Sequence, residues 1–290
     1  MYAHDMTKAH DAQAERAQAP LGTIGGGTMA TAILSGALEA GLSGPFGVAD
    51  RNADRRALFD ISFQAAGELL AWLERTEAAP GAGRVMLAVK PQSLEDVGDE
   101  IGEVLSRGPE RCVISVLAGV TTERLRAVLG GRVRIVRVMP NTPASVGLGM
   151  SAVCAGQTAT PGDLAYAVRL FEAVGRAIVI DEAMIDPFTG VAGSGPAYVF
   201  YLAEALTRAA ERMGFSNADA DAMVRQTILG SAELLARSPE QSAEVLRAAV
   251  SSRRGATLEA TGVFDRAGLV EIVERAVHAS RERSAELGRA

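Results

Sequence analysis

A glycine-rich segment, Gly25-x-Gly27-x-x-Ala30, directly follows the apolar stretch Leu21 to Ile24 and opens a run with helical spacing. Between a strand and a helix, this spacing is typical of a loop that holds the pyrophosphate of a dinucleotide. The first glycine allows a tight turn, and the second lets phosphate oxygens approach backbone N–H groups at the start of the helix. The small Ala30 lets the helix pack closely on the strand. We therefore expect a dinucleotide site here; the alternative is a glycine-rich turn in another α/β fold.

Asp50 and Arg51 stand about 20 residues further on, at the expected end of a second strand. A carboxylate at this place accepts hydrogen bonds from a ribose 2′-hydroxyl group and favours NAD. A guanidinium group there pairs with the 2′-phosphate of NADP. Because Arg51 lies just beyond the strand and has the reach, we expect NADP to be preferred. Ordinary surface charge is the alternative for either residue.

Short turns follow three further expected strands: Ala88-Val89-Lys90-Pro91, Ala118-Gly119 and Met139-Pro140-Asn141-Thr142-Pro143. Ligands of open parallel sheets bind beyond the carboxyl ends of the strands, so we expect these turns to line the bottom of one crevice beside the nicotinamide. Lys90 is the only lysine after Lys8; either it contacts the ligand or it faces water at the sheet edge. The Asn141 amide suits a carboxamide or a substrate carboxylate, or else it forms an Asx-turn before Pro143.

Two turns that contain hydroxyl groups stand in the C-terminal part, Gly193-Ser194-Gly195-Pro196-Ala197 and Ser251-Ser252-Arg253-Arg254-Gly255-Ala256-Thr257. Pro196 suits the first turn of a helix that Ser194 or Gly195 caps, which is punctuation rather than chemistry. A hydroxyl-rich turn with a glycine at a helix start, as in the second segment, makes a cradle of backbone N–H groups for an anion. Taken alone, the second segment is equally a capped loop.

The elements that must position these turns alternate between strand and helix patterns as far as residue 181. Strand patterns cover 21–24, 46–49, 84–89, 112–117, 133–139, 146–155 and 177–180, and helix patterns cover 28–40, 56–77, 93–105, 121–129 and 161–174. This alternation predicts a Rossmann-type parallel sheet.

Beyond residue 181 the strand signals stop. Helical periodicity covers 183–192, 196–213, 217–236, 241–249 and 267–286. The alanine- and leucine-rich faces exceed what so small a bundle buries, so we expect part of this surface to meet another subunit. The sequence thus predicts an α/β protein in three parts: a flexible tail over 1–19, a dinucleotide-binding domain over 20–181, and an all-helical dimerisation and substrate domain over 182–290.

Composition excludes several other classes of protein. The 290 residues carry a net charge of −6 and only 4% aromatic residues, which argues against a nucleic-acid surface. No apolar run reaches the length of a membrane span. The three histidines, His4, His10 and His278, lie near the chain ends, so a histidine metal site or a Ser-His-Asp triad in the folded body is not expected. Cys112 and Cys154 are interpreted as buried thiols of a protein of the reducing cytoplasm.

Together these segments resemble the pyrroline-5-carboxylate reductase family. The shared stretches are Ile24–Ala30, Ala88–Gln92, Ser115–Thr122, Arg137–Pro143, Asp186–Tyr198 and Ser251–Thr257. The most specific is Asp186-x-x-Thr189-x-x-x-Gly193-Ser194-Gly195-Pro196-Ala197-Tyr198. The resemblance implies reduction of 1-pyrroline-5-carboxylate to L-proline by NADPH, with NADH as a possible donor. It also implies homodimers with interlocked helical domains, assembled in many members into decamers.

The resemblance also implies roles for single residues. The cofactor contacts that it implies are Ile24, Gly25, Gly26, Gly27, Thr28, Met29, Arg51, Ala88, Val89, Lys90, Pro91, Ala118 and Asn141. The substrate loop that it implies comprises Ser252, Gly255, Ala256 and Thr257. Backbone amides of this loop hold the carboxylate, and the Thr257 hydroxyl group, the catalytic group, faces the ring nitrogen.

One departure leaves alternatives open. Where the family's substrate loop has proline and glycine, this chain has Arg253 and Arg254. The change keeps open a catalytically silent or regulatory relative and a reductase of another cyclic imine. Two other dehydrogenase classes fit less well. A β-hydroxyacid dehydrogenase needs a lysine in the helical domain, and a short-chain dehydrogenase needs Tyr-x-x-x-Lys; this chain has neither.

Overall fold

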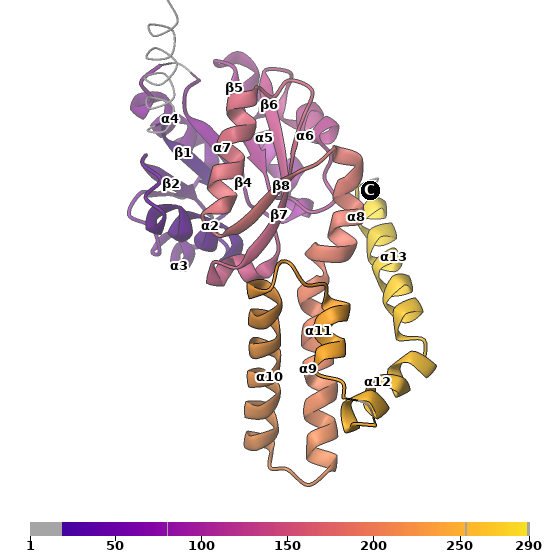
Figure 1. The fold of residues 1–290 in the computed structure, drawn as a ribbon. Coiled ribbons are helices and arrows are strands. Elements are labelled where there is room, and N and C mark those ends of the chain that lie inside the picture. The colour runs from indigo at the N-terminus through magenta and orange to yellow at the C-terminus, as the bar shows by residue number, and fades with distance from the viewer. Residues whose placement is uncertain (1–18, 80, 253, 289–290) are drawn as a thin grey trace, which may run out of the picture. The chain divides into compact units, whose positions relative to one another are not determined.

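The computed structural model describes residues 19–79, 81–252 and 254–288. Of the expected tail, residues 1–18 lie outside the described part of the chain, and Ala19 is buried. The chain forms two compact units (Figure 1). One runs up to Gly193 and takes in the residues from Ser280 onwards, and the other runs from Ser194 to Ala279.

An eight-stranded sheet with the order β3-β2-β1-β4-β5-β6-β7-β8 forms the centre of the first unit. Its strands are β1 (Leu21–Ile24), β2 (Phe46–Ala49), β3 (Ser62–Phe63), β4 (Arg84–Leu87), β5 (Arg111–Ser115), β6 (Val133–Met139), β7 (Gly149–Ala155) and β8 (Gly175–Val179). The expected Rossmann-type parallel sheet is confirmed for the first six strands. The last two extend it as predicted, but β7 pairs antiparallel to β6. The connection between them, residues 140–148, is too short for the crossover that a parallel pair needs.

Helices cover both faces of the sheet. On one face lie α4 (Ala66–Thr76), α5 (Leu94–Arg107) and α6 (Thr122–Leu129), whose leucines share one core cluster with the strands. On the other lie α2 (Thr28–Glu39) and α7 (Pro161–Glu172) around a second cluster. The stretch 56–77, expected to be largely helical, is helical only at its start, where the short helix α3 (Ala53–Arg56) ends, and in α4; the strand β3 lies between them. Two residues of strand are too few for an alternating pattern to show.

The strand register brings the expected ligand turns to one edge. Ile24 at the end of β1 pairs with Ala49 and Leu87, and Leu87 pairs with Ser115, which in turn pairs with Arg137. The carboxyl ends of five parallel strands therefore lie level. The loops that follow them emerge side by side.

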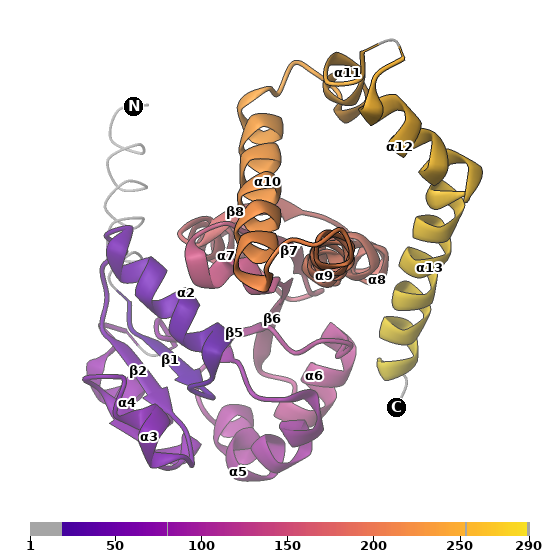
Figure 2. The same cartoon turned by 90° about the horizontal axis from the view of Figure 1, so that it is seen from below.

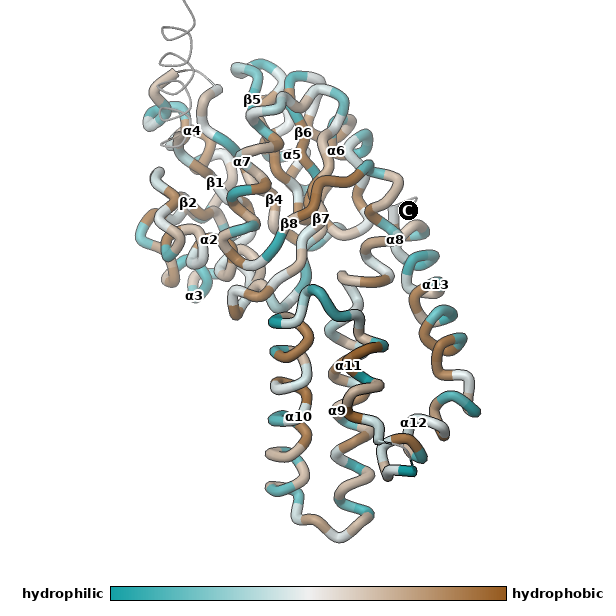
Figure 3. The backbone as a smooth tube through the Cα atoms, viewed as in Figure 1, coloured by the Kyte–Doolittle hydropathy of each residue, from teal (hydrophilic) through white to brown (hydrophobic). Residues whose placement is uncertain are grey.

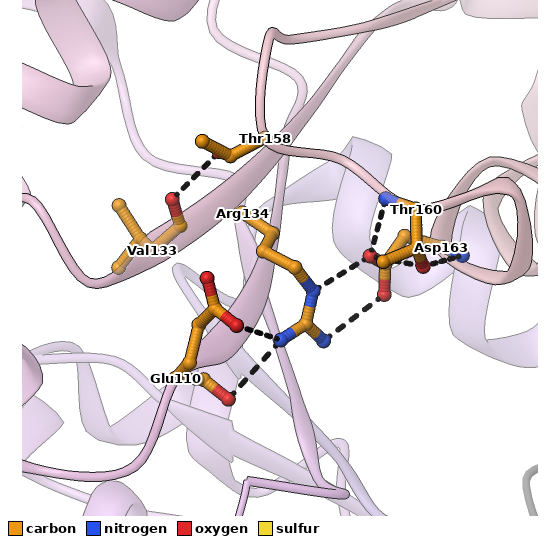
Figure 4. Close-up of polar contacts among 6 residues, drawn as sticks. All are labelled: Glu110, Val133, Arg134, Thr158, Thr160 and Asp163. Carbon is orange, nitrogen blue, oxygen red and sulfur yellow. Dashed lines mark hydrogen bonds and ion pairs between the residues drawn. The ribbon is translucent and has the colours of Figure 1, made fainter.

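The opposite edge of the sheet carries a cluster of buried charges that belongs to the scaffold. Arg134, near the start of β6, donates from Nε to Asp163 Oδ2 at 2.7 Å and from Nη2 to Oδ1 at 3.2 Å (Figure 4). The same carboxylate accepts from the Thr160 hydroxyl and backbone N–H groups, so it also caps α7. Arg111, the first residue of β5, makes a fully buried pair with Glu77 at 2.7 Å. These pairs pin helices to the sheet at the edge away from the ligand turns.

The second unit is helical, as predicted. It contains α9 (Gly195–Arg212), α10 (Asn217–Arg237), α11 (Ala243–Ala249), α12 (Ala256–Arg266) and most of α13 (Leu269–Leu287). The helices α9 and α10 lie side by side (Figure 2). The helix α12 lies outside the predicted ranges of helical periodicity, although the turn before it was considered as a helix start. Apolar residues recur along these helices (Figure 3), yet among the described residues of this unit only Ala220 and Val224 are buried.

Five short connecting elements complete the first unit. The segment after β8 forms a 3₁₀ turn η3 (Glu182–Met184), the short helix α8 (Ile185–Phe188) and a π-helix η4 (Thr189–Gly193). Two 3₁₀ turns, η1 (Pro91–Ser93) and η2 (Thr142–Val146), follow β4 and β6. Among the described helices, none is both long and apolar enough to cross a membrane.

Candidate dinucleotide and substrate site

The glycine loop has the geometry that a phosphate cradle needs. Gly25 has φ +98°, and a Cβ atom there would lie 2.7 Å from the carbonyl oxygen of Ala88, so both the backbone conformation and the space require glycine. Gly27 is the N-cap residue of α2, and a Cβ atom on it would meet nothing within 4 Å. The first turn of α2 carries no acidic residue. The loop therefore offers backbone N–H groups to an open space, which fits a pyrophosphate.

A cleft of about 600 Å³ lies at this loop. It brings together nine of the predicted cofactor residues: Ile24, Gly25, Gly27, Thr28, Met29, Arg51, Ala88, Val89 and Lys90. Gly26 instead lines an adjoining cleft of about 710 Å³ along α2. Lys90 lines this cleft and is also exposed, and its contact with a ligand stays a prediction. Pro91, Ala118 and Asn141 are not among the residues that line these two clefts, and their contact with a cofactor stays a prediction.

Asp50 lines the same cleft as Arg51, and both of its carboxylate oxygens accept hydrogen bonds from backbone N–H groups of the scaffold. Its Oδ2 accepts from the Gly26 N–H group at 2.8 Å, and its Oδ1 accepts from the Asn52 N–H group at 2.8 Å. Burial raises the pKa of this carboxyl group, but these backbone hydrogen bonds and Arg55 outweigh it and hold the pKa below its usual value. The side chain is only 8% exposed. Its bonds leave it poorly placed to bind both ribose hydroxyl groups.

Two arginines with exposed side chains stand beside Asp50. Arg51 is 75% exposed and lies 3.6 Å from Asp96 and 3.9 Å from Glu100. Arg55, which sequence reasoning missed, lies 3.5 Å from Asp50 and lines both clefts. Its position four residues after Arg51 is the signal that could have found it, because a short helix starting at Asn52 turns Arg55 back toward the strand end.

Asn141 connects the sheet to the π-helix η4. Its Nδ2 donates to the carbonyl oxygen of Ala192 at 2.9 Å, and its Oδ1 accepts from the Met150 N–H group at 2.8 Å. The side chain is nearly buried. Through these two hydrogen bonds the Asn141 amide positions Ala192 and Met150. One N–H bond of the amide remains for a ligand, so the same side chain has a donor left for a cofactor.

The loop that follows β5 is held by a residue that sequence reasoning also missed. Glu182 accepts from the Thr122 N–H group at 2.7 Å and from the Thr122 hydroxyl group at 2.6 Å, and it pairs with buried Arg137 at 3.0 Å. Thr122 begins α6, directly after the loop that contains Ala118. The partners are 60 residues apart in the chain, and no local pattern joins them.

The predicted substrate loop lies in the second unit, between α11 and α12. Gly255 is the N-cap residue of α12, and its N–H group donates to the Ser252 carbonyl oxygen at 2.9 Å. Ala256 and Thr257 form the first turn of α12, and Thr257 is exposed. Arg254 has φ +59°, a left-handed conformation that glycine adopts freely and arginine rarely does. Arg253 lies outside the described residues.

A Rossmann-type sheet with an open glycine loop, followed by a separate helical unit, defines a two-domain dinucleotide-dependent oxidoreductase. Residues 182–287 match the family model for pyrroline-5-carboxylate reductase dimerisation, and residues 20–119 match a model described as NADP oxidoreductase coenzyme F420-dependent. The pyrroline-5-carboxylate reductase of Synechocystis is 37% identical over 93% of this chain and 98% of its own length. That of Escherichia coli K12 is 36% identical over 93% and 98%.

Solved structures agree with these relatives. A pyrroline-5-carboxylate reductase from Coxiella burnetii superposes with a TM-score of 0.82 at 33% identity and covers 93% of this chain and 98% of its own. The Plasmodium falciparum pyrroline carboxylate reductase, solved with NADP bound, has a TM-score of 0.78 at 28% identity, with the same coverage. This chain belongs to the pyrroline-5-carboxylate reductase family.

Proposed function

We propose that this protein reduces 1-pyrroline-5-carboxylate to L-proline with NADPH as the electron donor. The observation that carries the proposal is identity of 33–37% to reductases of this name over nearly their whole length, combined with an open glycine loop at the carboxyl edge of the sheet. A catalytically silent relative and a reductase of another cyclic imine are not favoured by these relatives. Proline formation is then the last step of its biosynthesis.

The reaction adds one hydride ion to the imine carbon and leaves one proton on the ring nitrogen. NADPH, when bound, supplies the hydride. The protonated imine is already electrophilic, so the protein needs to position it more than to activate it. Gly255, as a glycine, leaves the first N–H groups of α12 without a side-chain cap, and these groups suit the substrate carboxylate. The Thr257 hydroxyl group donates or accepts a hydrogen bond at the ring nitrogen and stabilises the developing amine.

The cofactor is held by residues of the first unit alone. The proposed contacts are Ile24 to Met29, Arg51, Ala88 to Pro91, Ala118 and Asn141. We add Arg55 to this set because it lines the same cleft. With both Asp50 oxygens already engaged by backbone N–H groups, an arginine pair for a 2′-phosphate remains. This arrangement favours NADPH over NADH.

The chain self-associates through its helical unit, for which the matching model is a dimerisation model. We propose a homodimer as the basic assembly and a decamer built from five such dimers as the larger one. We keep 20–181 and 182–290 as the proposed functional domains. The compact units are divided differently, because the first one extends to Gly193 and also includes the residues from Ser280 onwards. The two buried, unpaired thiols of Cys112 and Cys154 support a location in the reducing cytoplasm.

Turnover of 1-pyrroline-5-carboxylate, followed as loss of NADPH absorbance, tests the proposal. We expect activity with NADPH above that with NADH. Thr257→Ala should lower kcat by about 100-fold without changing the Kd for NADPH, and Thr257→Ser should restore most of it. Thr261→Ala, one turn further along α12, is the matched control and should leave kcat unchanged. Binding of NADPH without turnover by the unaltered protein would identify a silent relative or another imine as substrate.

A further inference from the structure

The last part of α13 belongs to the first unit and is fastened to it by a hydrogen bond. Ser284 on α13 donates from its hydroxyl group to Asp186 Oδ1 at 2.6 Å, and Ser284 is the one buried position of this helix, all of which is described. Asp186 lies in α8, 98 residues earlier. The other positions of α13 are exposed or half-buried, so the serine stands out as an anchor.

Three residues after this anchor, the end of α13 rests on the loop that follows β5. A Cβ atom on Gly119 would lie 2.9 Å from Leu287 Cβ and 3.3 Å from the Gly288 nitrogen. A Cβ atom on Gly288 would in turn lie 2.5 Å from the Gly119 carbonyl oxygen. Gly119 has φ +77°. Two backbones therefore approach so closely here that both positions require glycine.

The same loop is held from its other end. Glu182 accepts both hydrogen bonds that Thr122 donates, and Glu182 and Asp186 belong to one connecting segment. That segment and the chain end are joined by the Ser284 bond. We name the group formed by Glu182, Asp186, Ser284 and Leu287 the C-terminal clasp.

We infer that the C-terminal clasp positions the loop from Leu117 to Val120 against the nicotinamide end of the cofactor, so that the end of the chain helps to set NADPH affinity. The inference rests on the proposed function, in which Ala118 contacts the cofactor. Ala118 has only a methyl group and Gly119 has no side chain, so neither residue can fix its own position through side-chain contacts. Leu117 and Val120 are buried on either side of them, while Ala118 is half-buried. The position of the Ala118–Gly119 backbone therefore depends on the residues that pack against it, and the C-terminal clasp supplies such residues.

Graded variants of the clasp test the inference. A chain that ends at Glu286 removes Leu287 and Gly288, and a chain that ends at Gly288 is its control. We expect the Kd and KM for NADPH to rise about tenfold in the first and to stay unchanged in the second. Ser284→Ala keeps the chain end and should give a smaller rise in the same direction. The KM for 1-pyrroline-5-carboxylate should change less than about twofold in all three.

A glycine pair separates the contact from backbone strain. Gly119→Ala introduces a Cβ atom against Leu287, whereas Gly41→Ala introduces one at nearly the same φ, +73°, with nothing within 4 Å. We expect only Gly119→Ala to weaken NADPH binding. If the clasp variants lower the thermal midpoint but keep the NADPH Kd, the clasp is merely structural and the inference is wrong. Because NADPH binding is measured directly, a failure of the unaltered protein to reduce the imine would contradict the proposed function alone.

Discussion

The two compact units of this chain differ in what they do with their apolar residues. The sheet unit encloses most of its large apolar side chains in clusters on both faces of the sheet. In the helical unit, the described residues include only two buried positions, Ala220 and Val224. Phe200, Tyr201 and Leu229 are each more than 60% exposed there. A surface of this kind is typical of a subunit interface, since single proteins rarely expose large apolar patches.

This difference predicts which step of the reaction, cofactor binding or turnover of the substrate, depends on assembly. The cofactor cleft is built from residues of the sheet unit, which buries its own core. The proposed substrate loop lies in the helical unit, whose helices leave apolar faces uncovered. We therefore expect NADPH binding to withstand loss of assembly and turnover to depend on it.

Placing a charge on the uncovered helical face tests this most strongly. Leu229→Glu puts a carboxylate on a side chain that is 63% exposed in the single chain and that we expect to be covered in the proposed dimer. We expect self-association to weaken by about 100-fold or more and turnover to fall with it. Light scattering after size exclusion and the rate of NADPH oxidation measure the two effects.

Leu38→Glu is the control, because Leu38 is 62% exposed in the sheet unit. It should change neither assembly nor turnover. Full activity of a Leu229→Glu protein that remains assembled would show that this helical face is not the interface.

Two glycines with nearly the same φ separate the effect of a substitution in the proposed ligand site from its effect in a simple turn. Gly25 in the cofactor loop has φ +98°, and Gly214 between α9 and α10 has φ +97°. A Cβ atom on Gly25 meets the Ala88 carbonyl oxygen at 2.7 Å, whereas one on Gly214 meets nothing within 4 Å. We expect Gly25→Ala to raise the NADPH Kd by at least about tenfold. Gly214→Ala should cost about 1 kcal/mol of strain and leave NADPH binding intact.

Isothermal titration with NADPH and thermal unfolding measure the two consequences separately. Equal losses of NADPH affinity in both alanine variants would mean that strain alone, and not the approach to Ala88, controls the loop.

Local patterns in the sequence predict the fold and the phosphate loop well. Alternation of strand and helix patterns identifies the sheet, and glycine spacing identifies the loop at Gly25 and Gly27. The direction of β7 does not follow from its apolar pattern, because period-two alternation is the same in parallel and antiparallel strands. The helix α12 begins at Ala256, directly behind a glycine turn that reads equally as a loop.

The contacts that sequence reasoning missed join residues far apart in the chain. Glu182 meets Thr122 across 60 residues, and Ser284 meets Asp186 across 98. Neither pair has a spacing that a local motif records. Asp50 shows the converse limit: its place at the end of β2 was predicted, but its hydrogen bonds to Gly26 and Asn52 depend on how the loop folds back.

Two ion pairs with the same Nε–Oδ2 distance provide the comparison with the smallest expected effect. Arg134 Nε lies 2.7 Å from Asp163 in the sheet unit, and Arg225 Nε lies 2.7 Å from Asp221 on α10. The Asp163 side chain is 6% exposed, whereas that of Asp221 is 49% exposed and open to screening by solvent. Asp163→Asn should cost about 2–4 kcal/mol in urea unfolding at neutral pH. Asp221→Asn should leave the urea midpoint unchanged within error.

The pH dependence of that difference follows from the pKa of Asp163. Burial raises this pKa, but the hydrogen bonds from Arg134 and Thr160 outweigh it and lower the pKa to about 2. Because the pKa is lower in the folded chain than the value of about 3.9 in the unfolded chain, the carboxylate stabilises the fold fully above about pH 4. This contribution is lost as the pH falls toward 2. The free energies of unfolding of the unaltered protein and of Asp163→Asn, from urea titrations, should therefore converge below about pH 4, by about 2–3 kcal/mol in total. A gap between the two proteins that stays constant down to about pH 2.5 would show that Asp163 acts through shape alone and not through its charge.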